Sequence, residues 1–301
     1  PIFQGKVDFA NFAPYVPASG AWDFEGIGIF LGGMYVAAWT TYAFETCVCY
    51  TKEFKHPKTD VPKSLILSGL LCIFMFSIVP FVFEGVLGTE ALSAPDIVDG
   101  TGVARAMGNM LGAGPAVTHI IVVMLLFSII LAVMTSMAGS SRTLYQASVD
   151  GWLPRYLSKV NKHGSPIYAM CTDLCFNLFL LMMSDYMVVL IASNCGYIIF
   201  NWMNLQSGWI HRIDRANVLR PFKIPKALLG FNVLLSFCNV AFLGVGAALL
   251  GTSNIITGLI ICAMIIPVFL FRHYYQDHGV FPTSTAEAEE DGAAHKRCGI
   301  L

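Results

Sequence analysis

The stretch GMYVAAWTTYAFETCVCYTKEFKHPKTDVPKS, residues 33 to 64, decides which fold class we expect for this chain. It starts as an apolar segment, passes Trp39-Thr40-Thr41, meets a single carboxylate at Glu45 and ends in a lysine-rich loop bounded by prolines. A charged side chain within hydrocarbon costs about 2.5 to 3.5 kcal/mol on insertion scales. We therefore expect Glu45 to face protein or a wet cavity, and we treat this stretch as a candidate site.

The composition predicts an integral membrane protein. Of the 301 residues, 56% are hydrophobic and 12% are charged, and the mean hydropathy is +0.65. An average soluble domain carries about twice that charged share. The net charge of -1 leaves no basic surface that would neutralise phosphates, so we exclude nucleic acid as a partner. The partners we expect are the lipid bilayer and a small-molecule substrate.

Charge-poor apolar runs predict seven transmembrane helices, because about 20 helical residues cross the hydrocarbon core of a bilayer. Residues 1–25 form a lead-in, 26–275 form the transmembrane domain, and 276–301 form a polar tail that we expect to be disordered. Pro62 is expected in the first turn of the second span, where a proline is tolerated. We place the spans at about 26–50, 62–87, 115–146, 167–183, 186–211, 227–250 and 254–273.

The basic residues lie mostly on one side of these spans. Placing the loop 52–63 in the cytoplasm puts 16 of the 18 Lys and Arg residues there. The positive-inside rule then predicts an external N-terminus and a cytoplasmic C-terminus, and we expect the plasma membrane as the location. Seven spans in this orientation also suit a receptor-like protein, which is the alternative function. The chain lacks the DRY-like and NPxxY-like motifs of G-protein-coupled receptors, which argues against that alternative.

Three motifs resemble the amino acid permeases of the amino acid, polyamine and organocation (APC) superfamily. WTTYAFETCVCYTKEFKHPKTDVPKSL, residues 39–65, resembles the sixth helix and the following loop of these proteins, with Glu53, Pro57 and Pro62 in an E-x-x-x-P-x-x-x-x-P-like pattern. SSRTLYQASVDGWLPRYLSKVNKHGSP, residues 140–166, is similar to the end of the eighth helix. RPFKIP, residues 220–225, looks like the lead into the eleventh helix.

The resemblance covers essentially the whole chain and implies an all-α integral membrane fold. It implies helices six to twelve of a partial inverted-repeat (5+5) APC-type fold that lacks the first five helices. The chain also opens without an initiator Met, and we expect a truncated product. The implied function is a secondary active transporter that moves amino acids or related amines by alternating access, not an enzyme. We expect this fragment not to transport alone.

The resemblance also implies a broken first helix near Trp39. A broken helix exposes backbone groups that bind polar substrates, and such backbone is tolerated where it lines a cavity. The small residues Thr40, Thr41 and Ala43 would permit the break, and with Trp39 they are candidate substrate contacts. The alternative is an intact helix in which the threonines bond back to carbonyls.

Trp39 and Glu45 have separate expected roles. Trp39 would close over the substrate or contact its ammonium group, and the alternative is a packing aromatic. Glu45 would couple protonation or gating to substrate occupancy, because the protonation of a buried carboxylate responds to nearby charge. The alternative for Glu45 is a structural acceptor for a neighbouring helix.

Hydroxyl and amide side chains in later spans add further candidates. Thr135 and Ser136 mark a possible ion site or a helix contact. Asn194, with Ser193 and Gly196, would line the pocket or join helices. We expect Asp173 to pair with a loop cation. We expect no cofactor, and a proton rather than sodium as the coupling ion, or exchange; the sequence identifies neither the substrate nor the oligomeric state.

Overall fold

A computed structural model describes residues 5–17, 19–42, 44–112, 114–182, 186–215, 220, 222–249 and 252–281. These described residues form helices and connecting segments and contain no strand. The helices are η2 Phe9–Phe12, α1 Phe24–Ala38, η3 Trp39–Thr41, η4 Phe44–Glu53, α2 Pro57–Leu92, α3 Pro95–Val98, α4 Val103–Leu111, α5 Pro115–Val149, η5 Arg155–Ser158, α6 Ile167–Met182, α7 Tyr186–Asp214, α8 Lys226–Leu249, α9 Thr252–Ala263, α10 Ile265–Leu270 and η6 Phe271–Gln276.

Four helical stretches are long and apolar enough to cross a membrane, which confirms the expected class of an all-helical, multi-pass membrane protein. They are Pro57–Leu92, Pro115–Val149, Val188–Asp214 and Ile255–Gln276. Two shorter apolar helices, Phe24–Ala38 and Ile167–Met182, fall below membrane length, and the apolar stretch Lys226–Phe242 is the first part of α8. The count of seven spans and the inverted repeat therefore stay predictions.

The first expected span, residues 26–50, is not one helix. α1 ends at Ala38, and a single 3-10 turn, η3, follows. Tyr42 is then extended, with φ −81° and ψ 168°, before the 3-10 helix η4 begins at Phe44. The break that was predicted near Trp39 is present in the structure.

α2 begins earlier than expected, at Pro57 rather than Pro62. Pro57 occupies the first turn, where its missing amide needs no partner, and Pro62 lies inside the helix. Near the other end, Gly88 adopts φ 75° and ψ 163°, and this kinks the helix. Only glycine takes such a φ without steric cost.

Two apolar cores hold the helices together. The first contains Tyr35, Ile191, Cys195 and Ile255, and it joins α1, α7 and α9. Gly258 on α9 lets that helix approach closely, because a Cβ there would lie 3.0 Å from the Ala192 backbone of α7. The second core joins α5, η5 and α6 through buried side chains; these are Leu153, Leu157 and Ala169.

The last apolar stretch is locally distorted at Met264, between α9 and α10. Pro267 lacks the amide that would bond to the carbonyl three to four residues earlier, and its ring crowds that turn. The Met264 amide is shared between the carbonyls of Ile260 and Ile261, at 3.1 and 3.3 Å. Met264 keeps helical angles, φ −60° and ψ −19°, so the stretch continues as one helix with a local distortion there, and it ends in the π-helix η6.

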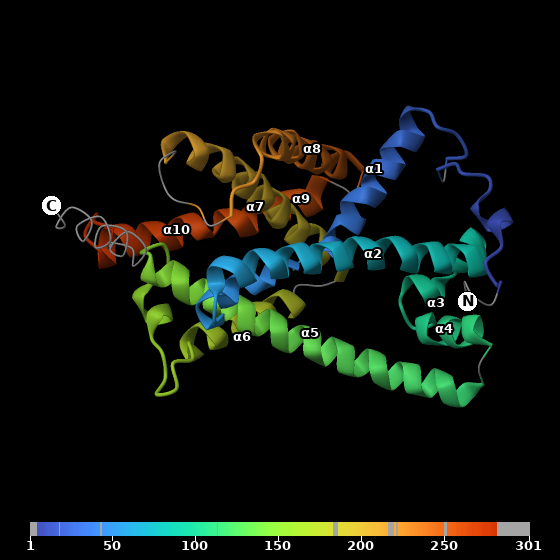
Figure 1. Cartoon of the computed structure of the whole chain (residues 1–301), viewed down its shortest axis with the longest axis horizontal. Helices are drawn as coiled ribbons and strands as arrows, with labels where there is room; N and C mark the ends of the chain where they lie inside the picture. Colours follow the sequence, from blue (N-terminus) through green and yellow to red (C-terminus); the bar gives the residue numbers. More distant parts are fainter. Residues whose placement is uncertain are drawn as a thin grey trace.

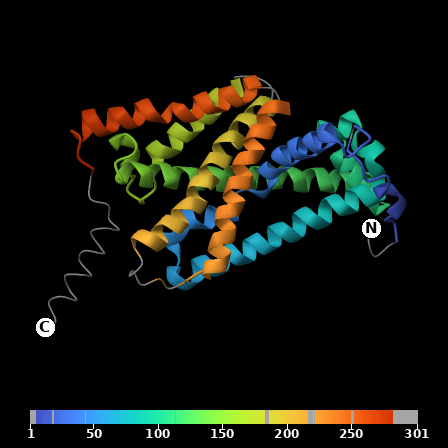
Figure 2. The same cartoon turned by 90° about the horizontal axis from the view of Figure 1, so that it is seen from above.

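The long helices α2 and α5 run along the longest dimension of the molecule (Figure 1). The short helices α3 and α4 lie at one end, near the N-terminal segment, and α10 lies toward the opposite end (Figure 1). α7 and α8 pack side by side, as the turned view shows (Figure 2). α1 packs against α7 and α8, and η4 packs against α2 and α5. The two parts of the broken helix therefore contact different helices.

Candidate functional site

The break between α1 and η4 is held open by a buried amide on α7. The Asn194 side chain is fully buried, its amide nitrogen donates to the Tyr35 carbonyl, and its amide oxygen accepts a hydrogen bond from the Tyr42 hydroxyl. The Tyr35 hydroxyl donates in return to the Ile191 carbonyl at 2.9 Å. Asn194 thus bonds to α1 before the break and to the extended Tyr42 within it. A buried amide is stable only when its groups are paired in this way.

Glu45 lies just after the break, in the first turn of η4, and it faces protein as the sequence predicted. Its Oε1 accepts a hydrogen bond from the Tyr197 hydroxyl of α7. The Tyr197 ring stacks on Tyr42, with 3.5 Å between ring centroids and 22° between ring planes. The second oxygen, Oε2, is buried and has no hydrogen-bond partner among the described residues. We call Tyr42, Glu45, Asn194 and Tyr197 the helix-break site.

An unpartnered buried carboxylate oxygen is costly, because a charged or polar group that loses water without gaining a partner keeps its desolvation penalty. A bound donor would remove that penalty. An ammonium group or an added proton satisfies Glu45 Oε2 directly. The helix-break site is therefore suited to bind a cationic or protonated group.

The other residues predicted around the break have different surroundings. The Trp39 side chain is 49% exposed at the end of α1. The Thr40 hydroxyl donates to the Ala37 carbonyl at 2.7 Å, which is the backbone bond that the alternative interpretation expected, but it occurs at a helix end rather than in an intact helix. The Thr41 side chain and Ala43 lie outside the described residues.

The structure does not bring the α5 candidates into the helix-break site. Thr135 is exposed, and its hydroxyl donates to Leu131 and Ala132 of its own helix, at 2.9 and 3.0 Å. Ser136 is exposed as well. One turn further along α5, Gly139 meets η4, since a Cβ there would lie 3.0 Å from the methyl group of Thr46.

Three further candidates have contacts that differ from the expectation or extend it. Asp173 accepts a hydrogen bond from the Ser140 hydroxyl at 2.6 Å, rather than the loop cation that we expected. The Ser193 hydroxyl bonds back to Leu190 of its own helix, at 2.9 Å. Gly196 allows α7 to approach α9, because a Cβ there would lie 3.0 Å from the Cys262 sulfur.

Sequence reasoning missed three tyrosines that build the site, Tyr35, Tyr42 and Tyr197. Tyr42 stands inside the quoted stretch, and Tyr197 follows Asn194 by three residues, a spacing that places both on one helix face. That spacing was the available signal. The pairing of Tyr197 with Glu45 joins residues 152 positions apart, and no local pattern predicts it.

A cavity of about 900 Å³, which we call the chamber, lies further along η4. Its walls come from η4, from the end of α5 and from the segment that joins α5 to α6. Arg142 bonds to Glu53 across it, with Nε and Nη2 each 2.7 Å from Oε1, and lies 4.4 Å from the Tyr50 ring centroid. Cys49 contacts Thr143 nearby, at 3.4 Å. Because η4 carries both Glu45 and Glu53, it connects the helix-break site to the chamber.

Comparison with known proteins identifies the family. The amino acid permease family matches residues 2–270. An uncharacterised transporter of Legionella pneumophila is 26% identical over 206 residues, which cover 68% of this chain and 42% of that protein. An uncharacterised amino acid permease of Bacillus subtilis is 27% identical over 205 residues, or 67% of this chain and 40% of that protein.

A branched-chain amino acid permease of Bacillus subtilis is 26% identical over 170 residues, which cover 53% of this chain and 32% of that protein. The chain thus spans about two fifths or less of the length of these relatives. No solved structure matches it significantly. Since the family match extends over nearly the whole sequence, the chain belongs to the amino acid permease family.

Proposed function

We propose that this chain supplies helices six to twelve of a secondary active transporter that moves amino acids or related amines across the plasma membrane by alternating access. The family match and the order of the three motifs support this assignment. The charge distribution supports an external N-terminus and a cytoplasmic C-terminus. The receptor alternative gains no support from the family match.

The free buried oxygen of Glu45 is the observation that carries the proposal. An amino acid or an amine brings an ammonium group with three donors, and one of them would satisfy Oε2 while Tyr197 holds Oε1. The irregular backbone of the break between Trp39 and Tyr42 would receive the substrate carboxylate or other polar groups. Trp39, Thr40, Thr41, Ala43 and Asn194 stay proposed substrate contacts.

The same oxygen explains how occupancy and coupling would be linked. When no substrate is bound, a proton on Glu45 would remove the desolvation penalty in its place. Substrate and proton would then compete for, or exchange at, one carboxylate, and this is the coupling that we propose. Release would follow η4 into the chamber, which the proposed orientation places on the cytoplasmic side.

Replacing Glu45 with Gln tests the proposal. In the protein expressed from its complete reading frame and reconstituted in liposomes, uptake of a panel of radiolabelled amino acids should fall by about tenfold or more, the loss expected for a charge-assisted hydrogen bond. The dependence of the remaining uptake on pH should differ from that of the unsubstituted protein. Glu90→Gln, an exposed carboxylate on α2, is the matched control. Equal uptake and an equal pH profile in Glu45→Gln would remove Glu45 from both roles.

We propose a proton, or exchange, rather than sodium as the coupling partner. The Thr135 hydroxyl is used within its own helix, and Thr135 and Ser136 are exposed, which leaves a sodium site at these residues without support from their surroundings. Replacing sodium with choline in the uptake medium should leave the rate unchanged. A loss of uptake in choline, together with a loss in Thr135→Ala, would favour sodium.

A further inference from the structure

The end of the described chain is packed against one wall of the chamber. The C-terminal segment, residues 269–281, meets the wall segment, residues 150–158, which leaves the end of α5. Trp152 and Asp150 of the wall segment line the chamber. We expected residues from 276 onward to be a disordered tail, and the structure differs for 276–281, which have defined contacts; residues 282–301 lie outside the described part.

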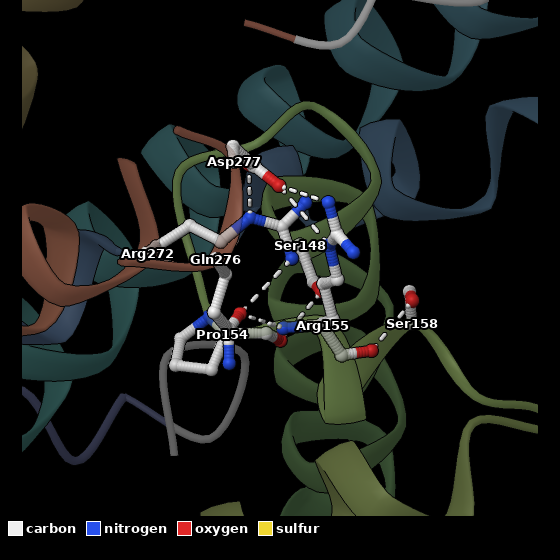
Figure 3. Close-up of polar contacts among 7 residues, drawn as sticks. All are labelled: Ser148, Pro154, Arg155, Ser158, Arg272, Gln276 and Asp277. Atoms are coloured by element: carbon white, nitrogen blue, oxygen red, sulfur yellow. Dashed lines mark hydrogen bonds and ion pairs between the residues drawn. The ribbon is translucent and has the colours of Figure 1, made fainter. Parts of the chain in front are cut away.

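A shared carboxylate makes the polar half of this contact. Asp277 Oδ1 accepts hydrogen bonds from Nε and Nη2 of Arg155, at 3.0 and 2.7 Å, and Asp277 Oδ2 accepts one from Nε of Arg272, at 2.5 Å (Figure 3). The Arg155 backbone amide donates a hydrogen bond to the side-chain oxygen of Gln276, at 2.9 Å. The Asp277 and Arg272 side chains are only 6% and 5% exposed. The carboxylate therefore joins a cation of the wall segment to a cation of the C-terminal segment.

Aromatic rings make the apolar half. Trp152 of the wall segment stacks on Phe269 at 5.3 Å and lies 5.5 Å from Phe281. His273 lies between Phe269 and Phe281, at 5.5 and 4.6 Å. Trp152 and Phe281 are 54% and 48% exposed, so these contacts are more easily separated than a buried core.

The chain reverses direction between Asp277 and Phe281 to complete the ring cluster. His278 takes φ 53° and Gly279 takes φ 81° in this reversal. A left-handed conformation at a residue other than glycine costs energy and persists only where surrounding contacts hold it. The ion pairs before the reversal and the Phe281 ring after it are the contacts that hold it here.

The wall segment is stiff enough to transmit a movement to the chamber. The Ser148 hydroxyl donates to the Pro154 carbonyl at 2.7 Å (Figure 3). Leu153 and Leu157 are buried against Ala169 of α6. Trp152 therefore moves with Arg155 as part of one compact turn. A change at the C-terminal segment would shift a residue that lines the chamber.

We propose that the Arg155–Asp277–Arg272 ion pairs and the Trp152–Phe269–Phe281 ring cluster form a latch through which the C-terminal segment holds the wall segment in place and keeps the opening of the chamber narrow. Releasing the latch frees the wall segment and widens the opening of the chamber. The proposal deepens the proposed transport function, since the chamber is its proposed exit. The latch itself is a property of the fold and is testable without transport.

The accessibility of Cys49, which lines the chamber, reports on the latch. In a variant whose other cysteines are replaced by alanine or serine, Cys49 is labelled with a bulky hydrophilic maleimide in lipid nanodiscs, where both faces of the bilayer are open to the reagent. Asp277→Asn should raise the labelling rate by about tenfold, the factor for loss of a charge-assisted hydrogen bond. Asp277→Glu, which keeps the charge, should restore most of the protection.

Two controls separate the latch from a general loss of structure. Asp99→Asn removes an exposed carboxylate that bonds only within its own turn, to Thr101, and it should leave Cys49 labelling unchanged. A cysteine placed at the fully buried Ser236, on α8, should be labelled at the same slow rate with and without Asp277→Asn. Unchanged Cys49 labelling in Asp277→Asn, with the protein folded, overturns the latch; equal acceleration at both cysteines also overturns it, because it indicates unfolding.

Failure of the latch and failure of the transport function are distinguishable. If Asp277→Asn opens the chamber but Glu45→Gln leaves uptake unchanged, the latch stands and the proposed role of Glu45 falls. If the opposite holds, the helix-break site stands and the C-terminal segment is a structural anchor only. If both hold, Asp277→Asn should also alter the uptake rate while leaving substrate affinity at the helix-break site unchanged.

Discussion

Glu45 and Asp277 are both shielded carboxylates, but their hydrogen bonds differ. Asp277 has both oxygens occupied, by Arg155 and by Arg272. Glu45 has one oxygen bonded to a neutral hydroxyl, that of Tyr197, and the other without a partner among the described residues. A carboxylate whose two oxygens both bond to cations stabilises the conformation that brings those cations together. A carboxylate with one unpaired oxygen can still bind a hydrogen-bond donor. The difference separates the latch, which holds a position, from the helix-break site, which we propose to bind a substrate.

The largest effect is expected when the buried partner of Asp277 is removed. Arg272→Ala should lower the free energy of unfolding by about 3 kcal/mol, because it leaves a shielded carboxylate with only its exposed partner. Arg155→Ala should cost about 1 kcal/mol, since its side chain is 63% exposed. Thermal unfolding in detergent measures both. Equal losses in the two variants would show that burial does not decide the strength of this pair.

Asn194→Ala should destabilise the helix-break site by about 2 kcal/mol, because the partly buried Tyr42 hydroxyl and the buried Tyr35 carbonyl both lose their partner. Ser193→Ala, one residue earlier on α7 and bonded only within its helix, is the matched control. Hydrogen exchange at residues 35–45 provides the local readout. Unchanged protection there would show that Asn194 does not hold the break.

Tyr197→Phe should have a smaller effect on substrate affinity than Glu45→Gln. The substitution removes the donor to Oε1 but leaves both carboxylate oxygens in place, so we expect a loss of about 1 kcal/mol, or roughly fivefold. Binding of a radiolabelled amino acid to the reconstituted protein measures it. A loss as large as that of Glu45→Gln would mean that the tyrosine, rather than the carboxylate, makes the main substrate contact.

The latch should respond to acid, with a sign fixed by Asp277. Burial opposes ionisation of this carboxyl, but the hydrogen bonds and charges of Arg155 and Arg272 outweigh it and hold the pKa below its usual value. A lowered pKa contributes stability that is complete above the unfolded value of about 4 and is lost as the pH falls through the lowered value. Cys49 protection, measured as its labelling rate relative to that of a free cysteine peptide at the same pH, should therefore stay constant from pH 7 to about 4 and decline below. Asp277→Asn should remove this decline.

The smallest effect is expected at the surface pair Arg105–Asp96, between the short helices α3 and α4. Both side chains are exposed, at 68% and 39%, so Arg105→Ala should change the free energy of unfolding by no more than about 0.5 kcal/mol. Thermal unfolding of this variant therefore gives the baseline for the others. A larger change would mean that the Arg105–Asp96 ion pair contributes substantially to the stability of α3 and α4.

Much of the fold was predictable because composition and apolar run length report directly on a lipid environment. Trp39 and its small neighbours also predicted the helix break, since the family motif carries them. Glu45 was predicted to face protein, because a carboxylate in hydrocarbon is costly. These predictions needed only local sequence and solvent energetics.

The partners of these residues were not predictable, because they depend on packing between distant segments. Tyr197 reaches Glu45 only after α7 packs against the break, and Asp277 reaches Arg155 across 122 positions. The polar composition after Gln276 predicted disorder. Composition does not show that Asp277 and Phe281 have partners in a distant segment. Thr135 and Ser136 were singled out by their depth in a span, and depth alone does not tell which way a hydroxyl points.

The local distortion at Met264 affects how movement of the C-terminal segment would pass along the last apolar stretch to α7. The portion before it is fixed to α7 by the close approach at Gly258, and the portion after it is fixed to the wall segment through Asp277. Because both portions are anchored, bending at Met264 would let the far portion move without displacing Asn194. Pro267→Ala restores the missing amide and would stiffen the helix there, so movement of the C-terminal segment would then be passed on to α7.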